Sequence, residues 1–198
     1  MKYRGVRADP FATSQVNVIR TSQSHPLHIA TVEVAPGLGK IGVTFAPGKH
    51  DPHAASGDWA RDLAADLDAI VAWPARTLVT LIEPHEFELL RIPTLGDEAK
   101  LRGLDWHHLP IRDVRVPSPA FEAVWPTQSE ALRGKLAAGE NIVVHCRGGL
   151  GRAGMIAARL LVESGIDPKA AIARVRAVRP GAIETSAQDD WARTGPRA

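Results

Sequence analysis

The segment 141–162 constrains the fold more than any other part of the chain. Residues 141–146 form a short run rich in β-branched side chains, which is typical of a buried strand. Residues 152–162 have the length and the apolar composition of a buried helix. The loop between them is rich in glycine. We therefore predict a strand, a loop and a helix in direct succession, with the loop leading into the N-terminus of the helix.

This loop places a cysteine and an arginine at a spacing suited to holding a phosphate. Cys146, the only cysteine in the chain, ends the predicted strand, and Arg152 follows after five intervening residues. The residues between them are Arg147, Gly148, Gly149, Leu150 and Gly151. Glycines tolerate the positive φ angles with which successive N–H groups curl around one anion. We expect these amides and the helix dipole to cradle a tetrahedral oxyanion, with Arg152 as a bidentate charge clamp.

The same surroundings would activate the thiol of Cys146. A cysteine at a helix N-terminus or beside a cation titrates at roughly 3.5 to 7.5, against about 8.5 for a free thiol. We therefore expect Cys146 to be an anion at neutral pH. A lone cysteine is usually a core residue and a glycine run is usually a turn, but the combination of both with an arginine favours a phosphate site.

A dinucleotide site is a rival interpretation of the same loop. Residues 149–154 fit the pattern G-x-G-x-x-G, which marks such sites when it lies between a strand and a helix. The segment 167–178 that follows is helical in pattern, so the second strand with a terminal acid is missing. A dinucleotide would also leave Cys146 without a role, and the phosphate site is therefore preferred.

The run from His145 to Arg152 resembles the His-Cys-x5-Arg signature of the cysteine-dependent protein phosphatases. Within that superfamily the chain is similar to the dual-specificity type, and most to its kinase-associated phosphatase branch. The resemblance extends over about 40–188, with further matches at 105–113 and 179–185. It implies hydrolysis of phosphomonoesters, with phosphotyrosine, phosphoserine or phosphothreonine of proteins as substrates, through a phosphocysteine intermediate.

Three more residues receive roles near the site. Asp113 follows the predicted strand 106–111, so it would emerge at the same sheet edge as Cys146 and act as general acid; Asp105 is the alternative, at the opposite edge. His145 is expected to be a buried, hydrogen-bonded residue that fixes the loop. Gln188 matches a glutamine of the family that orients the attacking water.

The residue after the signature arginine departs from the family pattern. The family usually has serine or threonine there, where the hydroxyl helps the cysteine to leave in the second step, whereas this chain has Ala153. Breakdown of the phosphoenzyme would then be slower or helped by another group. Two alternatives stay open: a phosphate-binding pseudo-enzyme or scaffolding module, and a sulfur-transfer or arsenate-reducing cysteine enzyme.

The chain as a whole predicts one α/β domain, with a central, mainly parallel sheet, an N-terminal hairpin and helices on both faces. Residues 1–26 are polar and aperiodic, so we expect an arm that is partly disordered, followed by the phosphatase domain over 27–198. The other expected elements are hairpin strands over 29–34 and 41–45, a helix from an N-cap at Asp58 to Pro74, a strand over 78–82, a helix over 95–104, a strand over 106–111, a helix over 120–138 broken or kinked at Pro126, and a helix over 167–178.

Composition and motifs also bear on cofactors, partners and location. The formal charge of +2 and the dispersed basic residues argue against nucleic acid, and the absence of a long apolar run argues against a membrane. The cluster at 50–53 has ligand-type side chains but is expected to be a loop, so no metal and no cofactor are predicted. The expected partner is a phosphorylated protein or a small phosphoester. A lipid substrate is disfavoured because the loop lacks additional lysines.

The cysteine content bears on location. A single cysteine excludes an internal disulfide and favours the cytoplasm. The sequence does not indicate the oligomeric state.

Overall fold

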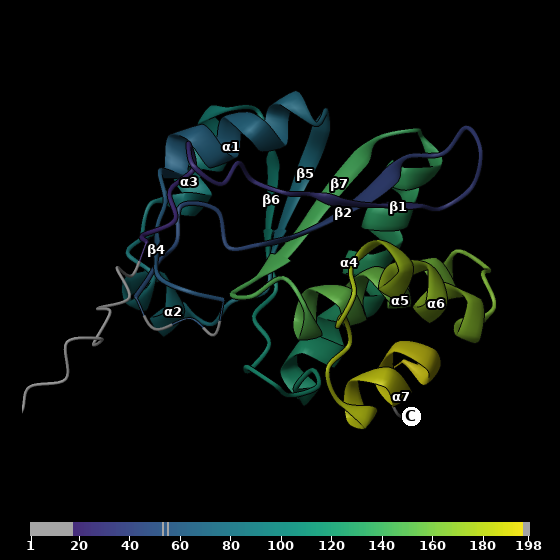
Figure 1. Cartoon of the computed structure of the whole chain (residues 1–198). Coiled ribbons are helices and arrows are strands. Elements are labelled where there is room, and N and C mark those ends of the chain that lie inside the picture. Colours follow the sequence, from purple (N-terminus) through teal and green to yellow (C-terminus); the bar gives the residue numbers. More distant parts are fainter. Residues whose placement is uncertain (1–17, 53, 55, 196–198) are drawn as a thin grey trace, which may run out of the picture.

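The computed structural model describes residues 18–52, 54 and 56–195, which form an α/β domain with a five-stranded sheet between two groups of helices (Figure 1). This confirms the predicted fold class. The strands of the sheet are β1 (Ala30–Glu33), β2 (Lys40–Phe45), β5 (Ala75–Thr80), β6 (Asp105–His108) and β7 (Asn141–Cys146), and their order is β1-β2-β7-β5-β6. The predicted hairpin of β1 and β2 is antiparallel, and all other pairs in the sheet are parallel.

Helices cover the sheet on both sides (Figure 1). Their bounds are α1 (Leu63–Ala72), α2 (Pro84–Leu89), α3 (Leu95–Leu101), α4 (Pro119–Ala137), α5 (Gly151–Glu163), α6 (Pro168–Val178) and α7 (Ser186–Thr194). α1 and α3 lie against one face, whereas α4, α5 and α6 lie against the other and α7 packs on α5. Two hydrophobic cores result, one on each face of the sheet.

The central strand β7 contributes to both cores, which explains its uninterrupted apolar sequence. Val143 belongs to the core beneath α1 and α3, whereas Ile142, Val144 and Cys146 belong to the core beneath α4 and α5. All four side chains are buried. Full burial of a valine or isoleucine side chain contributes about 1.5–3 kcal/mol. The strand is thus firmly held at the point where it delivers Cys146 to its carboxyl end.

Several expected elements differ from the structure. The helix expected from Asp58 begins instead after Asp62, whose carboxylate accepts the N–H of Ala65 at 2.8 Å. The residues expected to open it form β4 (Trp59–Ala60), which pairs with β3 (His50–Asp51). The strand expected over 106–111 begins at Asp105 and ends at His108, although the N–H groups of Leu109 and Ile111 still donate to Thr80 O and Leu81 O.

The helix α4 continues through Pro126, so the expected break is absent from this described helix. Proline removes one internal hydrogen bond, and the buried face of the helix on both sides of Pro126 packs in the core. The expected helix over 95–104 ends at Leu101, and the strand expected over 78–82 begins at Ala75 and ends at Thr80.

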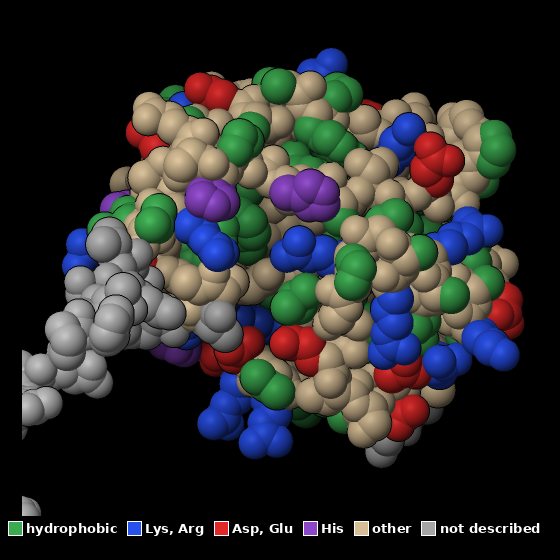
Figure 2. Space-filling view, viewed as in Figure 1, with side chains coloured by type: hydrophobic (Ala, Val, Ile, Leu, Met, Phe, Trp, Pro, Cys, Tyr) green, Lys and Arg blue, Asp and Glu red, His purple; other side chains and the backbone are tan. Residues whose placement is uncertain are grey.

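Most of the expected arm lies outside the described residues. Its described part, 18–26, passes beside β4, where the N–H of Arg20 donates to Asp58 O (2.9 Å) and the N–H of Ala60 donates to Arg20 O (3.0 Å). In the part of the chain that the structure describes, no helix combines the length and the apolar composition needed to cross a membrane. Figure 2 shows Lys and Arg side chains interspersed with Asp and Glu on the visible face.

Candidate active site

The glycine-rich loop connects β7 to α5 at the carboxyl end of the sheet (Figure 1). Cys146 is buried, and its Sγ accepts the N–H of Gly149 at 3.2 Å. Gly149 has φ +68°, and a Cβ there would lie 2.5 Å from the backbone of Phe45 and Thr44. Only glycine fits this position, because a side chain would displace the backbone of β2. The loop backbone is therefore turned so that an amide faces the sulfur.

His145 lies one residue before the sulfur and is fully buried. Its Nε2 lies 2.8 Å from Thr80 Oγ1, which also accepts the indole N–H of Trp106 at 2.9 Å. Burial lowers the pKa of His145 to about 3, so the ring is neutral at physiological pH. A neutral ring anchored to β5 suits the expected role in fixing the loop, and that role remains a prediction.

The guanidinium of Arg152 is buried and held by three neighbours. It forms a bidentate ion pair with Glu86 of α2 (2.6 and 3.0 Å), donates to Ile111 O (3.1 Å) and contacts Asp113 Oδ1 (2.9 Å). Burial by itself lowers the pKa of Arg152, but the hydrogen bonds of Glu86 and the nearby charges raise it above its ordinary value. Its buried Nε has no hydrogen-bond partner among the described residues, so one N–H remains for an anion.

Glu86 was not found from the sequence. Its carboxylate also accepts the backbone N–H of Glu83 (2.8 Å), which fixes it at the start of α2. The structure thus adds a residue whose function is to hold Arg152 in one orientation. An acidic residue after the carboxyl end of a strand was the available signal, and many surface positions share it.

We expect Glu86→Gln to lower the free energy of unfolding by roughly 3–5 kcal/mol, because it removes the buried, bidentate carboxylate from Arg152 and leaves only the half-exposed Asp113. Urea unfolding at pH 7 would measure the change. Glu88→Gln is a matched control on the same helix, where the side chain is exposed. Equal stabilities of the two variants would contradict this view of the ion pair.

The structure brings Asp113 to the same cavity as Cys146. Asp113 is half-exposed, and its Oδ1 accepts the N–H of Val114 at 3.1 Å. Val114 has φ +58°, a costly conformation for a β-branched residue, so the loop is strained next to the carboxylate. Asp105 lies at the opposite end of β6, where it pairs with Lys135 and His107.

The cavity has a volume of about 510 Å³ and opens over the loop. Besides Cys146 and Asp113, its walls include Lys49, Trp59, Arg179 and Glu184. Arg179 donates to Gly149 O (2.9 Å) and Gly148 O (3.1 Å). These bonds fix the orientation of the two loop carbonyls.

Gln188 does not line this cavity. It is buried, its Oε1 accepts the N–H of Glu184 (3.0 Å), and its Nε2 donates to Arg115 O (3.2 Å). Glu184 in turn accepts the N–H of Gly151 with its carboxylate at 2.9 Å. In this arrangement Gln188 positions the backbone beside the loop, and its expected contact with water remains a prediction.

The first loop residue, Arg147, pairs with Asp51 of β3 through two hydrogen bonds of 2.9 and 3.0 Å. The cluster at 50–53 thus contributes Asp51 to the site, while His53 lies outside the described residues. Within the described ranges, no group of three or more His, Cys, Asp or Glu side chains could hold a metal.

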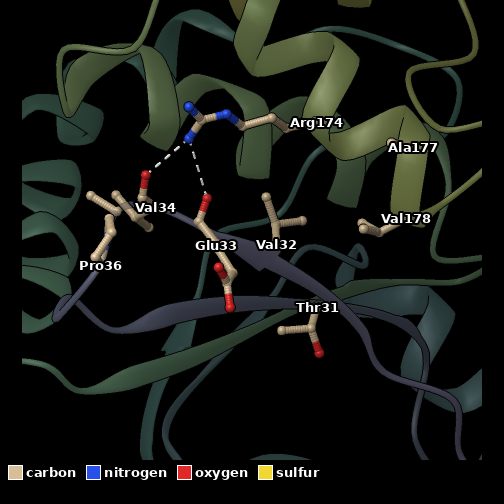
Figure 3. A pocket seen from close by; sticks show the side chains of 9 residues that line it. Thr31, Val32, Glu33, Val34, Pro36, Arg174, Ala177 and Val178 are labelled. Atoms are coloured by element: carbon tan, nitrogen blue, oxygen red, sulfur yellow. Dashed lines mark hydrogen bonds between the residues drawn. The ribbon is translucent and has the colours of Figure 1, made fainter.

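A second cavity lies between β1 and α6, away from the loop. Figure 3 shows Arg174 reaching across it to the carbonyls of Val34 (2.9 Å) and Glu33 (3.5 Å). The side chains that line it include no cysteine, histidine or lysine, and its guanidinium is bound to backbone. The cavity above Cys146 is therefore the candidate active site.

Comparisons with known proteins agree with this geometry. The family model "PTP-SAK: Swiss Army Knife protein, DSP-PTPase phosphatase domain" matches residues 61–192. Cyclin-dependent kinase inhibitor 3 of Rattus norvegicus is 31% identical over 137 residues, which cover 68% of this chain and 63% of that protein. The protein of the same name from Homo sapiens is 30% identical over 137 residues, with the same coverage. The match thus spans less than two thirds of the length of these relatives.

Solved structures match over a larger share of this chain and of their own length. Kinase associated phosphatase with its catalytic cysteine replaced by serine superposes with a TM-score of 0.73 at 26% identity, covering 84% of this chain and 92% of the other. Tk-PTP in its active form gives a TM-score of 0.61 at 26% identity, with 81% and 92% covered. The signature loop, the fold and the family model agree, and the chain belongs to the PTP-SAK family of dual-specificity phosphatase domains.

Proposed function

We propose that this chain hydrolyses phosphomonoesters of phosphorylated proteins through a phosphocysteine on Cys146. One observation carries the proposal: the sulfur of Cys146 lines a cavity and accepts a loop amide, and Arg152, with an unpaired Nε, lies in the first turn of the helix that follows this loop. Phosphoryl transfer depends mainly on positioning and on stabilising charge, which such a loop supplies. Since the reaction needs a reduced thiol, we place the chain in a reducing compartment such as the cytoplasm.

In the first step Cys146 attacks phosphorus in line with the ester oxygen. The S–P bond forms as the P–O bond to the leaving group breaks, and Asp113 gives its proton to the departing oxygen. The loop amides and Arg152 stabilise the equatorial oxygens. An incoming phosphate would compete with Asp113 for Arg152, which frees the carboxyl group to turn toward the leaving oxygen.

In the second step water attacks the phosphocysteine. Asp113, now ionised, takes a proton from the water as the P–S bond breaks, and phosphate and the thiolate are released. The thiolate nucleophile, the general acid and the general base of this cycle are side chains of this protein. Gln188 and Glu184 support the step by holding the backbone beside the loop.

The test uses a phosphotyrosine peptide with a radioactive phosphoryl group and protein treated with a metal chelator. Rapid denaturation at alkaline pH, where the P–S bond is stable, should trap the label on Cys146, and vanadate should block both labelling and phosphate release. Phosphate binding without label or turnover would instead support the pseudo-enzyme. Reduction of arsenate at the expense of an added thiol, without release of phosphate, would support the arsenate-reducing alternative.

We expect Ala153→Ser to speed breakdown of the phosphoenzyme, so that kcat rises several-fold and the trapped label falls. The reason is that the family hydroxyl helps the cysteine to leave, and Ala153 lies fully buried at the start of α5 beside the loop. Rapid-quench kinetics would measure both quantities. Ala157→Ser, one turn further along α5 and equally buried, is the control. A wild type without an initial burst would contradict slow breakdown.

A further inference from the structure

Lys49 is a buried cation in the wall of the active-site cavity, and the proposed reaction does not use it. The residue is 3% exposed and lines the cavity that contains Cys146. Its Nζ lies 5.1 Å from the ring centroid of Phe45 and 5.1 Å from that of Trp59. Two aromatic faces thus hold the ammonium in place.

The position of Lys49 relative to the phosphate loop follows from the sheet register. Phe45 pairs with Cys146 in adjacent parallel strands, so the segment that follows β2 runs beside the loop that follows β7. The Nζ of Lys49 donates to Arg147 O at 3.5 Å. The ammonium therefore lies on the carbonyl side of the first loop residue, whereas the amides face the phosphoryl group. It is placed to meet a group bound beside the phosphoryl group.

Asp113 and Glu184 also line the cavity, but the charges nearest to Lys49 belong to two ion pairs, so that this part of the wall has a net positive charge. Arg147 is paired with Asp51, and Arg61 is paired with Asp66 through bonds of 2.7 and 2.8 Å. Lys49 adds a positive charge to these two ion pairs. An ammonium has three N–H donors, and the bond to Arg147 O uses one of them.

The fold keeps this ammonium at a cost. Burial lowers the pKa of Lys49 to about 8, although the charge of Asp51 opposes the shift. An uncharged side chain could pack between the two rings without the free-energy cost of burying a charge. Lys49 therefore places a buried charge in the wall of a cavity that is proposed to bind an anion, which indicates a function in binding.

We infer that Lys49, with Arg147 beside it, binds a second phosphoryl group of the substrate, so that the site prefers phosphoesters that carry two phosphoryl groups close together. The inference rests on the proposed function, since Cys146 and its loop would hold the first group. Lys49 and Arg147 would recognise the second phosphoryl group only through its charge and its hydrogen bonds. A bisphosphorylated small molecule and a peptide with two neighbouring phosphorylated side chains both offer such a group.

Calorimetry with non-hydrolysable ligands tests the binding. Methylphosphonate represents the first group, and bisphosphonates with one to four methylene groups between the phosphorus atoms represent both. For the wild type, at least one bisphosphonate should bind about tenfold tighter than methylphosphonate or better, well beyond the factor of about two expected from its two equivalent ends. Lys49→Met should reduce this advantage to about twofold, and Lys49→Arg should retain part of it.

Lys100→Met is a matched control. Lys100 also lies over a tryptophan, 5.0 Å from the ring centroid of Trp106, but it is exposed and away from the cavity. This variant should keep the full advantage. Lys49→Met removes a buried charge and is expected to fold, which urea unfolding would verify. If it does not fold, the pH dependence of the wild type decides the question.

That pH dependence has a definite sign. Because the pKa of Lys49 is lowered to about 8, the ammonium is charged below this pH and loses its charge above it. The groups facing it are Asp51, Arg147, Cys146 and Arg61. The bisphosphonate advantage should therefore be full near pH 7 and decline as the pH rises above 8, although the ligand itself becomes more negative.

Turnover distinguishes the two sources of the second group. We would compare kcat/KM for a singly and a doubly phosphorylated peptide, and for a sugar monophosphate and bisphosphate, in wild type and Lys49→Met. If the preference for the doubly phosphorylated substrate is lost in Lys49→Met for the peptides, the second group belongs to a protein substrate. If it is lost for the sugars, the second group belongs to a small molecule. The inference is overturned if no bisphosphonate exceeds the twofold factor, or if the variant weakens methylphosphonate and bisphosphonates alike. Failure of methylphosphonate itself to bind would instead refute the proposed function.

Discussion

Replacing Cys146 by serine is expected to lower kcat/KM for an aryl phosphate by about 10⁵-fold or more, the scale of loss seen when a catalytic nucleophile is removed. A serine hydroxyl stays protonated at neutral pH, and no general base lies in the described hydrogen bonds of this side chain. The loop amide of Gly149 that faces the sulfur would have no anion to stabilise. Steady-state assays with an aryl phosphate would measure the loss.

The fold and the anion cradle should survive this substitution. Serine is close in size to cysteine, and its oxygen can accept the same N–H of Gly149. Phosphate binding measured by calorimetry should persist, and the free energy of unfolding should change by only about 1 kcal/mol. Arg159→Lys, two turns along α5 from the loop and bound to Glu163, controls for general effects of substitution on this helix. Retained turnover in Cys146→Ser would refute the mechanism.

The part of the site that is local in sequence could be predicted. The strand, the glycine loop and the helix lie within one segment, so spacing alone placed Cys146 and Arg152 on one loop. The parallel arrangement of the strands then brought Asp113 to the same edge, because connections from parallel strands meet at their carboxyl ends. Asp105 lies at the other end of β6 for the same reason.

The contacts that join distant segments could not be predicted. Glu86 meets Arg152 from α2, and Asp51 meets Arg147 from β3, through pairings that no local pattern encodes. Lys49 follows a proline and a glycine and has the composition of an ordinary exposed turn, yet it is buried between two rings. One of these rings, Trp59, was expected in a helix and instead forms β4, which makes the cavity wall.

The error at Trp59 has a physical reason. Apolar spacing from residue 59 onward fits a helix, but Arg61 is drawn into a buried ion pair with Asp66, and the N–H of Arg61 donates to Lys49 O at 3.2 Å. These tertiary contacts hold residues 59–61 in an extended path, and the helix can begin only after Asp62. Tertiary structure has here overridden a local preference, at the segment that shapes the site.

Asp113→Asn is expected to lower kcat for esters with poor leaving groups by about 10²- to 10⁴-fold, the usual contribution of a general acid. Asparagine cannot donate a proton to the leaving oxygen or remove one from water. For an ester of a strongly acidic phenol, the rate of the first step should fall much less in the variant, because the leaving oxygen needs no proton. With a series of aryl phosphates whose phenols differ in pKa, the rate of the first step should therefore depend more steeply on that pKa in the variant than in the wild type.

Binding should change in the opposite sense to catalysis. Asp113 Oδ1 lies 2.9 Å from the guanidinium of Arg152, so its negative charge competes with an incoming phosphate for that group. Removing the charge should keep phosphate affinity or tighten it while kcat falls. Asp105→Asn, on the far edge of the sheet, should leave both values within about twofold, as surface substitutions usually do. Full turnover of esters with poor leaving groups by Asp113→Asn would show that another group is the general acid. The strained loop at Val114 would then hold a carboxylate that takes no part in the proton transfer.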